Sequence, residues 1–202
     1  VSGAAVIFML IPVLIITVNQ LLTVKGNQAA AGSSPALRFT FAGIVFFIIY
    51  CVFAALSSFL SVGKLTQVSF TSSGIQILAI LGFFSMTMYG AIYFIVPRLT
   101  GVEWPSLKKI NSHFIISIYA MGTLLMMHYF GGVWQSSAYG KFDAPMENAI
   151  SAGKPYAIGA SVAWAFIVFS TLGFLFNLIT ILLRSGRREI ASKLVGYQDS
   201  SG

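Results

Sequence analysis

Residues 70–104 of this chain read FTSSGIQILAILGFFSMTMYGAIYFIVPRLTGVEW, and this stretch decides the fold. Residues 68–96 contain no Asp, Glu, Lys or Arg. As a helix they would extend about 43 Å at 1.5 Å per residue. The hydrocarbon core of a bilayer is only about 30 Å thick. We therefore predict a membrane-spanning helix that tilts or protrudes, ends at Pro97 and is followed by a short charged connector.

The whole chain has the composition of a membrane protein. Hydrophobic residues make up 57% of it and charged residues 8%, whereas a soluble domain carries about 25% charged residues. Four further apolar runs flank the central one, and Gly131-Gly132 is expected to end the fourth span. We predict an all-α integral membrane fold in one domain, residues 1–183, followed by a basic and polar tail, residues 184–202. The predicted spans cover residues 4–24, 37–62, 68–96, 110–130 and 155–183.

The net charge of +7 comes from residues at the ends of the apolar runs, which argues against a nucleic-acid-binding role. Alternate ends carry unequal numbers of Lys and Arg, and cytoplasmic loops of membrane proteins are the richer ones. We therefore predict a bacterial-type inner membrane location, with the N-terminus outside, the C-terminus in the cytoplasm and the loop 133–154 outside. The nine cytoplasmic cations are Lys25, Arg38, Arg98, Lys108, Lys109, Arg184, Arg187, Arg188 and Lys193, against Lys64, Lys141 and Lys154 outside.

The ionisable residues offer no obvious chemistry. No acid, Lys or Arg lies in the middle of a predicted span, which argues against proton or ion transport by this chain alone. His113 and His128 are fifteen residues apart, about 22 Å along a helix, so they cannot bind one metal together. We expect His113 to be an interfacial polar residue and Cys51 a buried small hydrophobe. A contact of His128 with a partner's haem stays open.

Two sets of residues are candidates for binding. Small residues recur at helical spacing in the last span, which permits close helix packing either within this chain or against another subunit. A lipid or quinone pocket is the second candidate. The interface candidates are Ala157, Gly159, Ser161, Ala163 and Ala165, and the pocket candidates are Gln76, Tyr89, Tyr93 and Trp104.

Residues 88–104, MYGAIYFIVPRLTGVEW, resemble the tenth helix and following loop of the catalytic subunit (subunit I) of cbb-type haem-copper oxidases. That family includes the related nitric oxide reductases. Further marks resemble the eighth, ninth and twelfth helices in matching order, so the resemblance covers nearly the whole chain as helices 8–12. These marks are Pro12 and Asn19, then residues 34–39 (SPALRF), then Pro155-Tyr156, Gly173, Asn177 and Thr180.

The chain departs from this family at its haem site. The resemblance implies iron-binding histidines early in the tenth helix, but depending on the alignment those positions hold Ser72 or Ile75 and Ile77. No histidine precedes His113, so no register restores these ligands. The family's copper ligands belong to earlier helices, and its usual Arg near the haem propionates is replaced by Ala157, Ile158 and Gly159 after Pro155-Tyr156.

From these departures we expect a haem-free, truncated paralogue without a cofactor, catalytic residues or enzyme activity. Its expected role is that of an accessory, structural subunit in a respiratory electron-transport complex of the cytochrome c oxidase type, with other subunits and lipids as partners. Two alternatives stay open. The chain could complete a split oxidase or nitric oxide reductase whose haem-bearing core is another polypeptide, or it could be a lipid- or quinone-binding membrane module.

Overall fold

The described chain consists of long helices and short connections. A computed structural model describes residues 2–25, 32–59, 62–63, 66, 69–139 and 145–200, without the side chains of 2–7, 9–10, 24 and 189–200. No strand occurs among these residues, which confirms the predicted all-α fold. The helices are α1 (Ser2–Val24), α3 (Pro35–Ser57), α5 (Phe70–Ile77), the π-helix η1 (Leu78–Ser85), α6 (Met86–Thr100), α7 (Leu107–Tyr139) and α8 (Met146–Ser200).

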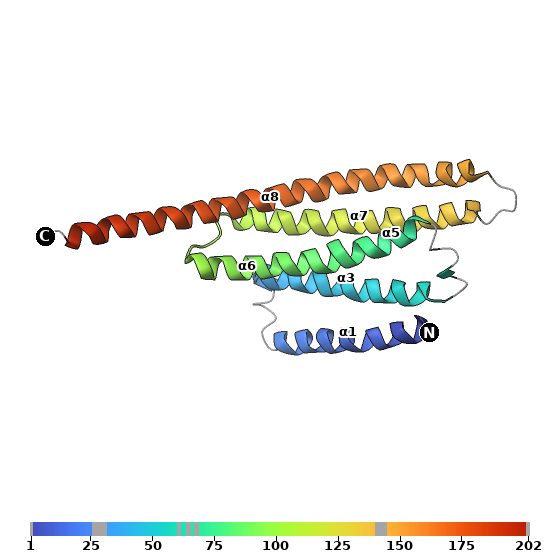
Figure 1. Ribbon diagram of the computed structural model, residues 1–202, viewed down its shortest axis with the longest axis horizontal. Helices are drawn as coiled ribbons and strands as arrows, with labels where there is room; N and C mark the ends of the chain where they lie inside the picture. Colours follow the sequence, from blue (N-terminus) through green and yellow to red (C-terminus); the bar gives the residue numbers. More distant parts are fainter. Residues whose placement is uncertain are drawn as a thin grey trace.

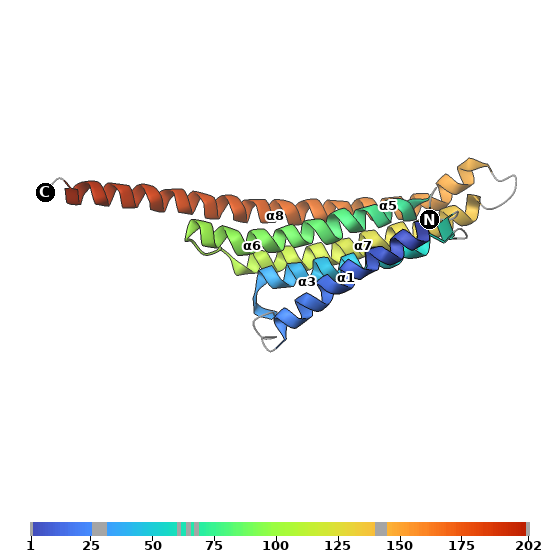
Figure 2. The ribbon, with the colours of Figure 1, turned by 60° about the horizontal axis from the view of Figure 1, so that its bottom comes forward.

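Within the described residues, four stretches are long and apolar enough to cross a membrane: Pro35–Ser57, Phe70–Thr100, Leu107–Tyr139 and Met146–Arg188. A shorter apolar helix segment, Ile11–Thr23, belongs to α1. The protein is therefore a multi-pass membrane protein. Several helices extend beyond the apolar runs that predicted them, and α8 continues past the ends of its neighbours (Figures 1 and 2).

Successive spans run in alternating directions, with α5, η1 and α6 forming one of them, so the end of α6 and the beginnings of α3 and α7 lie at one end of the bundle (Figure 1). Polar contacts join the elements there. Arg38 Nη1 donates to Asn111 Oδ1 at 2.9 Å, and Arg188 Nη1 donates to the Gly101 carbonyl at 3.0 Å. This end thus gathers the cations that the topology prediction places in the cytoplasm. Lys64 and Lys141, two of the three on the other side, lie outside the described residues.

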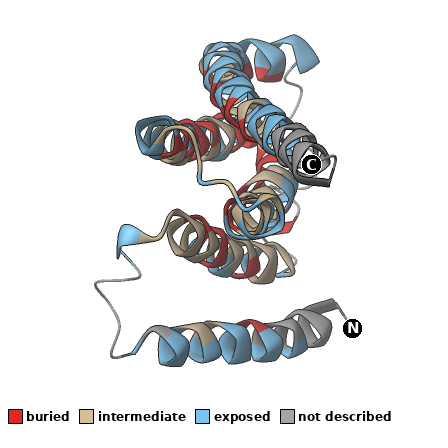
Figure 3. Cartoon of the chain, turned by 90° about the vertical axis from the view of Figure 1, so that its left-hand side faces the viewer, coloured by how far each residue is buried: buried red, intermediate tan, exposed pale blue. Residues whose placement is uncertain are grey.

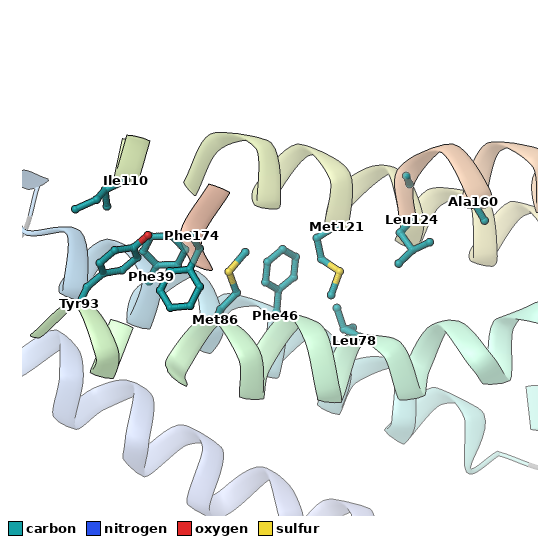
Figure 4. Close-up of a cluster of buried hydrophobic side chains, with 11 residues drawn as sticks. Phe39, Phe46, Leu78, Met86, Tyr93, Ile110, Met121, Leu124, Ala160 and Phe174 are labelled. Atoms are coloured by element: carbon teal, nitrogen blue, oxygen red, sulfur yellow. The ribbon is translucent and has the colours of Figure 1, made fainter. Parts of the chain in front are cut away.

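The core lies between α3, the α5–η1–α6 helix, α7 and α8, and Figure 3 shows the buried residues concentrated there. Figure 4 shows Phe39, Tyr93 and Phe174 meeting near one end, with Leu78 and Leu124 further along. Helix α1 packs on α3 and leaves most of its described apolar side chains exposed. In a bilayer such side chains face lipid or another protein.

The third predicted span is one continuous helix that contains a π-helical segment, η1. In η1 the turns are wider than in an α-helix, and Ser85 Oγ donates to the Ile80 carbonyl five residues back at 3.1 Å. The prediction that Pro97 ends the helix is wrong, because α6 continues to Thr100 and ends at Gly101, whose φ is +62°. Proline at position 97 cannot donate to the carbonyl of Tyr93. The Trp104 indole N–H donates to that carbonyl instead, at 3.0 Å.

The prediction that Gly131-Gly132 ends the fourth span is also wrong. Helix α7 continues to Tyr139, and α8 begins at Met146, so much of the expected loop 133–154 is helical. A Cβ on Gly131 would lie 2.6 Å from Tyr156 Cβ, and one on Gly132 would overlap Thr71. These glycines allow α7 to approach α5 and α8 closely. Asp143, in the connection, lies outside the described residues.

Candidate functional site

The positions at which the resemblance implies haem ligands lie on α5, packed against other helices of the same chain. Ser72, Ile75 and Ile77 are each half-buried. Ile77 packs against the hydrophobic core. Gly74, between them, faces α7 so closely that a Cβ on it would lie 2.7 Å from His128 Cβ. This turn of α5 is therefore held against α7 by direct contact.

The cavity next to Ile75 is too small for a porphyrin. Its volume is about 10 Å³, which is roughly the space that one water molecule needs. Phe53, Leu78, Leu125 and Tyr129 contribute to its apolar wall. An isoleucine also has no lone pair to offer iron. The residues present here do not fit a haem group bound from α5.

His128 lies next to this turn of α5. Its Nδ1 donates to the Leu124 carbonyl of its own helix at 2.8 Å, so Nε2 is the nitrogen left for any other contact. The side chain is half-buried. Within the described part of the chain, no three His, Cys, Asp or Glu residues lie together as metal ligands would.

His113 occupies the most heavily buried polar position in α7, contrary to the expectation that it is an interfacial residue. Only 3% of it is exposed. The imidazole ring lies 4.9 Å from Phe39, 4.6 Å from Tyr89 and 5.2 Å from Phe174, measured between ring centroids. Its Nδ1 lies 2.9 Å from the Tyr93 hydroxyl. The adjacent Asn111 and Ser112 are exposed, so sequence neighbours were a poor guide to the environment of this side chain.

A short chain of hydroxyl groups joins α7 to α8 beside His113. The Ser170 hydroxyl donates to the His113 carbonyl at 3.1 Å, and Ser117 Oγ lies 2.9 Å from Ser170 Oγ. Because Ser170 uses its only proton on the carbonyl, Ser117 is the donor of the second bond. Tyr89 and Thr171 make a similar hydroxyl contact at 3.2 Å. The serine bonds fix the register of α7 against α8, and the Tyr89 contact joins α6 to α8.

Two buried polar groups in this region have no partner within the described residues: His113 Nε2, and both amide atoms of Asn177. Asn177 is 1% exposed and lies on α8 three residues after Phe174. An unpaired polar group in a protein interior costs about 1–3 kcal/mol. The aromatic cluster around His113, formed with Phe39, Tyr89, Tyr93 and Phe174, is therefore held together mainly by side-chain packing. Hydrogen bonds satisfy only some of its polar atoms.

Three of the four pocket candidates meet around His113, and the fourth does not. Tyr93 contacts both His113 and Trp104, and Tyr89 contacts His113. Gln76 is exposed on α5, about 20 Å along the helix from Tyr89 at 1.5 Å per residue. The cavity that Tyr89 lines has a volume of only about 30 Å³. The aromatic residues are packed against one another rather than around an open quinone-sized space.

The small residues of the last span divide into two groups. Ala163 is 1% exposed, and a Cβ on Gly159 would lie 2.5 Å from Met127 Sδ, so these two residues pack against α7. Ser161 and Ala165 are exposed, and Ala157 is half-buried. The Ser161 hydroxyl donates to the Ala157 carbonyl at 2.9 Å. Gly159 and Ala163 thus pack within this chain, whereas the face of α8 with Ser161 and Ala165 is available for packing against another subunit.

Comparison with known proteins gives one distant relative. No family model matches the chain. Over 183 residues it is 22% identical to a protein of Agrobacterium tumefaciens (strain T37) named cytochrome c oxidase subunit 1 homolog, and the alignment covers 87% of this chain. It covers 34% of the relative, so the chain spans about a third of that protein's length. This similarity supports a relationship to subunit I of the haem-copper oxidases and nothing narrower.

Proposed function

We propose that this chain is a haem-free paralogue of the cbb-type oxidase catalytic subunit and acts as a structural, accessory subunit of a respiratory membrane complex of the cytochrome c oxidase type. In this role it has no enzyme activity of its own. The observation that carries the proposal is the packing of Ser72, Ile75 and Ile77 at the expected ligand positions, beside a cavity of about 10 Å³. Helix packing depends on the shapes of the side chains and not on haem ligands. The fold can therefore be retained after the haem ligands are lost.

A protein partner is supported by a face of small residues on α8 that includes the exposed Ser161 and Ala165. Ala157, Ser161 and Ala165 are spaced four residues apart and therefore share one helix face. Small side chains allow a neighbouring helix to approach closely in a bilayer, where van der Waals packing drives association. We propose that this face receives a helix of another subunit. The proposed location is the inner membrane, with the C-terminus and the cation-rich end in the cytoplasm.

A second candidate is a split oxidase, in which this chain completes a haem-bearing core supplied by another polypeptide. One observation favours it: His128 lies against the turn of α5 where the ligands are missing, with Nε2 left for another contact. Replacing His128 by Phe separates the two candidates. The haem spectrum of the purified complex stays unchanged if the chain is a structural subunit, and it loses a haem signal if His128 is an iron ligand.

The direct experiment is affinity purification of the tagged chain from its own membranes in a mild detergent, with mass spectrometric identification of the subunits. Oxidase subunits present in a fixed ratio to the chain would support the accessory role. Recovery of the chain alone, in a detergent that keeps a known respiratory complex of the same membranes intact, would contradict it. Replacing exposed Ala165 by Trp should release the partners, whereas replacing Ser137, exposed near the end of α7, by Trp should not.

A further inference from the structure

A groove runs between α7 and α8, starting at the cation-rich end of the bundle. It consists of two adjoining hollows that share Ile116 in their walls. The hollow nearer the helix end has a volume of about 310 Å³, and the one toward the middle of the bundle about 270 Å³. The first lies just inside and the second just below the range for small-molecule sites, roughly 300–1,000 Å³. The outer hollow has His113 and Ser170 in its wall and so borders the aromatic cluster described above, whereas neither hollow includes a residue of the turn at Ile75.

The outer hollow has two lysines in its lining. Lys108 and Lys109 lie at its rim together with Ser112. Neither lysine makes an ion pair among the residues that the structure describes, and the ammonium of Lys109 lies 4.1 Å from the centroid of the Phe176 ring. The two charges are therefore not compensated by protein carboxylates there. They stand at the end of a membrane-spanning helix, at the level where lipid headgroups lie.

The inner hollow is apolar. Beyond Ile116 the walls are formed by side chains such as Tyr119, Val162 and Phe166, with the small Ala120 and Ala163 at the base. Ala120 and Ala163 are almost fully buried, so the hollow exists because these two facing residues are small. A polar molecule would gain nothing from this half of the groove.

Gly173 leaves room in the outer hollow. It lies in the wall of that hollow, and a Cβ added to it meets no atom within 4 Å. This glycine is therefore not needed for close approach of α7 to α8, unlike Gly132. A glycine in a helix interior without a packing reason destabilises the helix by about 1 kcal/mol relative to alanine.

We propose that this groove is a binding site for an anionic phospholipid, with the phosphate at Lys108 and Lys109 and an acyl chain along Ile116 between Ala120 and Ala163. Basic pockets between membrane helices suit anionic headgroups, and the apolar continuation suits a chain rather than a free phosphate ion. The site lies outside the regions on which the accessory role rests, so each proposal can fail without the other.

The steric test is Gly173→Leu in the full chain, in the assembly with which it purifies. A Cβ at this position meets no protein atom within 4 Å, so the leucine side chain has the outer hollow to occupy. Native mass spectrometry with added phosphatidylglycerol should then show about tenfold weaker binding than in the wild type. The matched control is Gly122→Leu, since Gly122 also lies in a helix with nothing within 4 Å of an added Cβ, but outside this groove. That variant should bind as the wild type does.

The charge test compares phosphatidylglycerol with phosphatidylcholine. The double variant Lys108→Gln, Lys109→Gln should lose the preference for the anionic lipid, by about tenfold, because each cation near a membrane surface contributes to its attraction. Lys154→Gln, which removes one cation at the other end of the bundle, is the control and should keep the preference. Equal binding of both lipids by the wild type, undiminished binding by Gly173→Leu, or cross-linking from position 173 to a partner protein instead of lipid would each overturn the proposal.

Discussion

At the scale of single residues, Trp104 shows how a proline is accommodated inside α6. Pro97 leaves the Tyr93 carbonyl without its helical donor, and the indole N–H of Trp104 takes that place at 3.0 Å. Trp104→Phe keeps most of the packing but leaves the carbonyl unpaired. We expect a loss of about 1–2 kcal/mol in the free energy of unfolding, measured by denaturation in detergent micelles. Trp134→Phe, at an exposed position of α7, is the control and should change little.

Asn177 is a residue whose replacement should not weaken the fold. Both of its amide atoms are buried without a partner among the described residues. Burying the native side chain therefore costs free energy of desolvation that no hydrogen bond within the described residues recovers. Asn177→Leu removes these polar atoms and keeps the number and branching of the side-chain heavy atoms. We expect the unfolding free energy to stay the same or to rise by about 1 kcal/mol. A loss of more than about 1 kcal/mol would show that the amide is bonded to water or to another subunit.

The sequence did not predict the environment of His113, for a physical reason. His113 was expected at the interface because Asn111 and Ser112 are polar, yet its neighbours in space are Phe39 and Phe174, which come from α3 and α8. The environment of a side chain is set by helix faces that meet in three dimensions, and these are not readable from adjacent residues. The absence of histidine from α5, in contrast, could be read from the sequence alone.

At the scale of elements, the apolar runs predicted the helices, but Gly and Pro did not predict where the helices end. Gly131 and Gly132 lie within α7 because Tyr156 and Thr71 come too close for a side chain there. Pro97 lies within α6 because Trp104, seven residues on, supplies the missing donor. The partners of the glycines are distant along the chain, and the partner of Pro97 lies beyond the end of the helix, so the Gly or Pro by itself does not indicate either.

A pair of glycines on α7 tests this interpretation of helix contacts. Gly132→Ala should reduce the unfolding free energy by about 1–3 kcal/mol, because the added methyl group overlaps Thr71 of α5. Gly122→Ala, with open space around the added Cβ, should stabilise the helix by up to about 1 kcal/mol. Thermal unfolding of the two variants in one detergent gives the comparison. Equal effects of the two changes would contradict the close contact of α5 with α7.

At the scale of the whole molecule, the alternating helices place the cation-rich ends together, and the positive-inside rule then predicts a cytoplasmic location for that end. Cys51 is the only cysteine and is buried, so single-cysteine reporters are simple to build after Cys51→Ser. Met146→Cys should react with a membrane-impermeant maleimide in intact cells. Leu107→Cys, exposed at the other end, should react only after lysis. The reverse pattern would invert the predicted topology.

The distant similarity to an oxidase subunit and the closed turn around Ile75 together suggest a scaffold retained without its cofactor chemistry. The measurement that tests this most directly is a pyridine haemochrome spectrum of the chain after its partners have been dissociated. We predict no haem on this chain, while the haem-bearing subunits that co-purify with it retain theirs. Haem that stays bound to the isolated chain, with iron coordinated by one of its own side chains, would contradict the account.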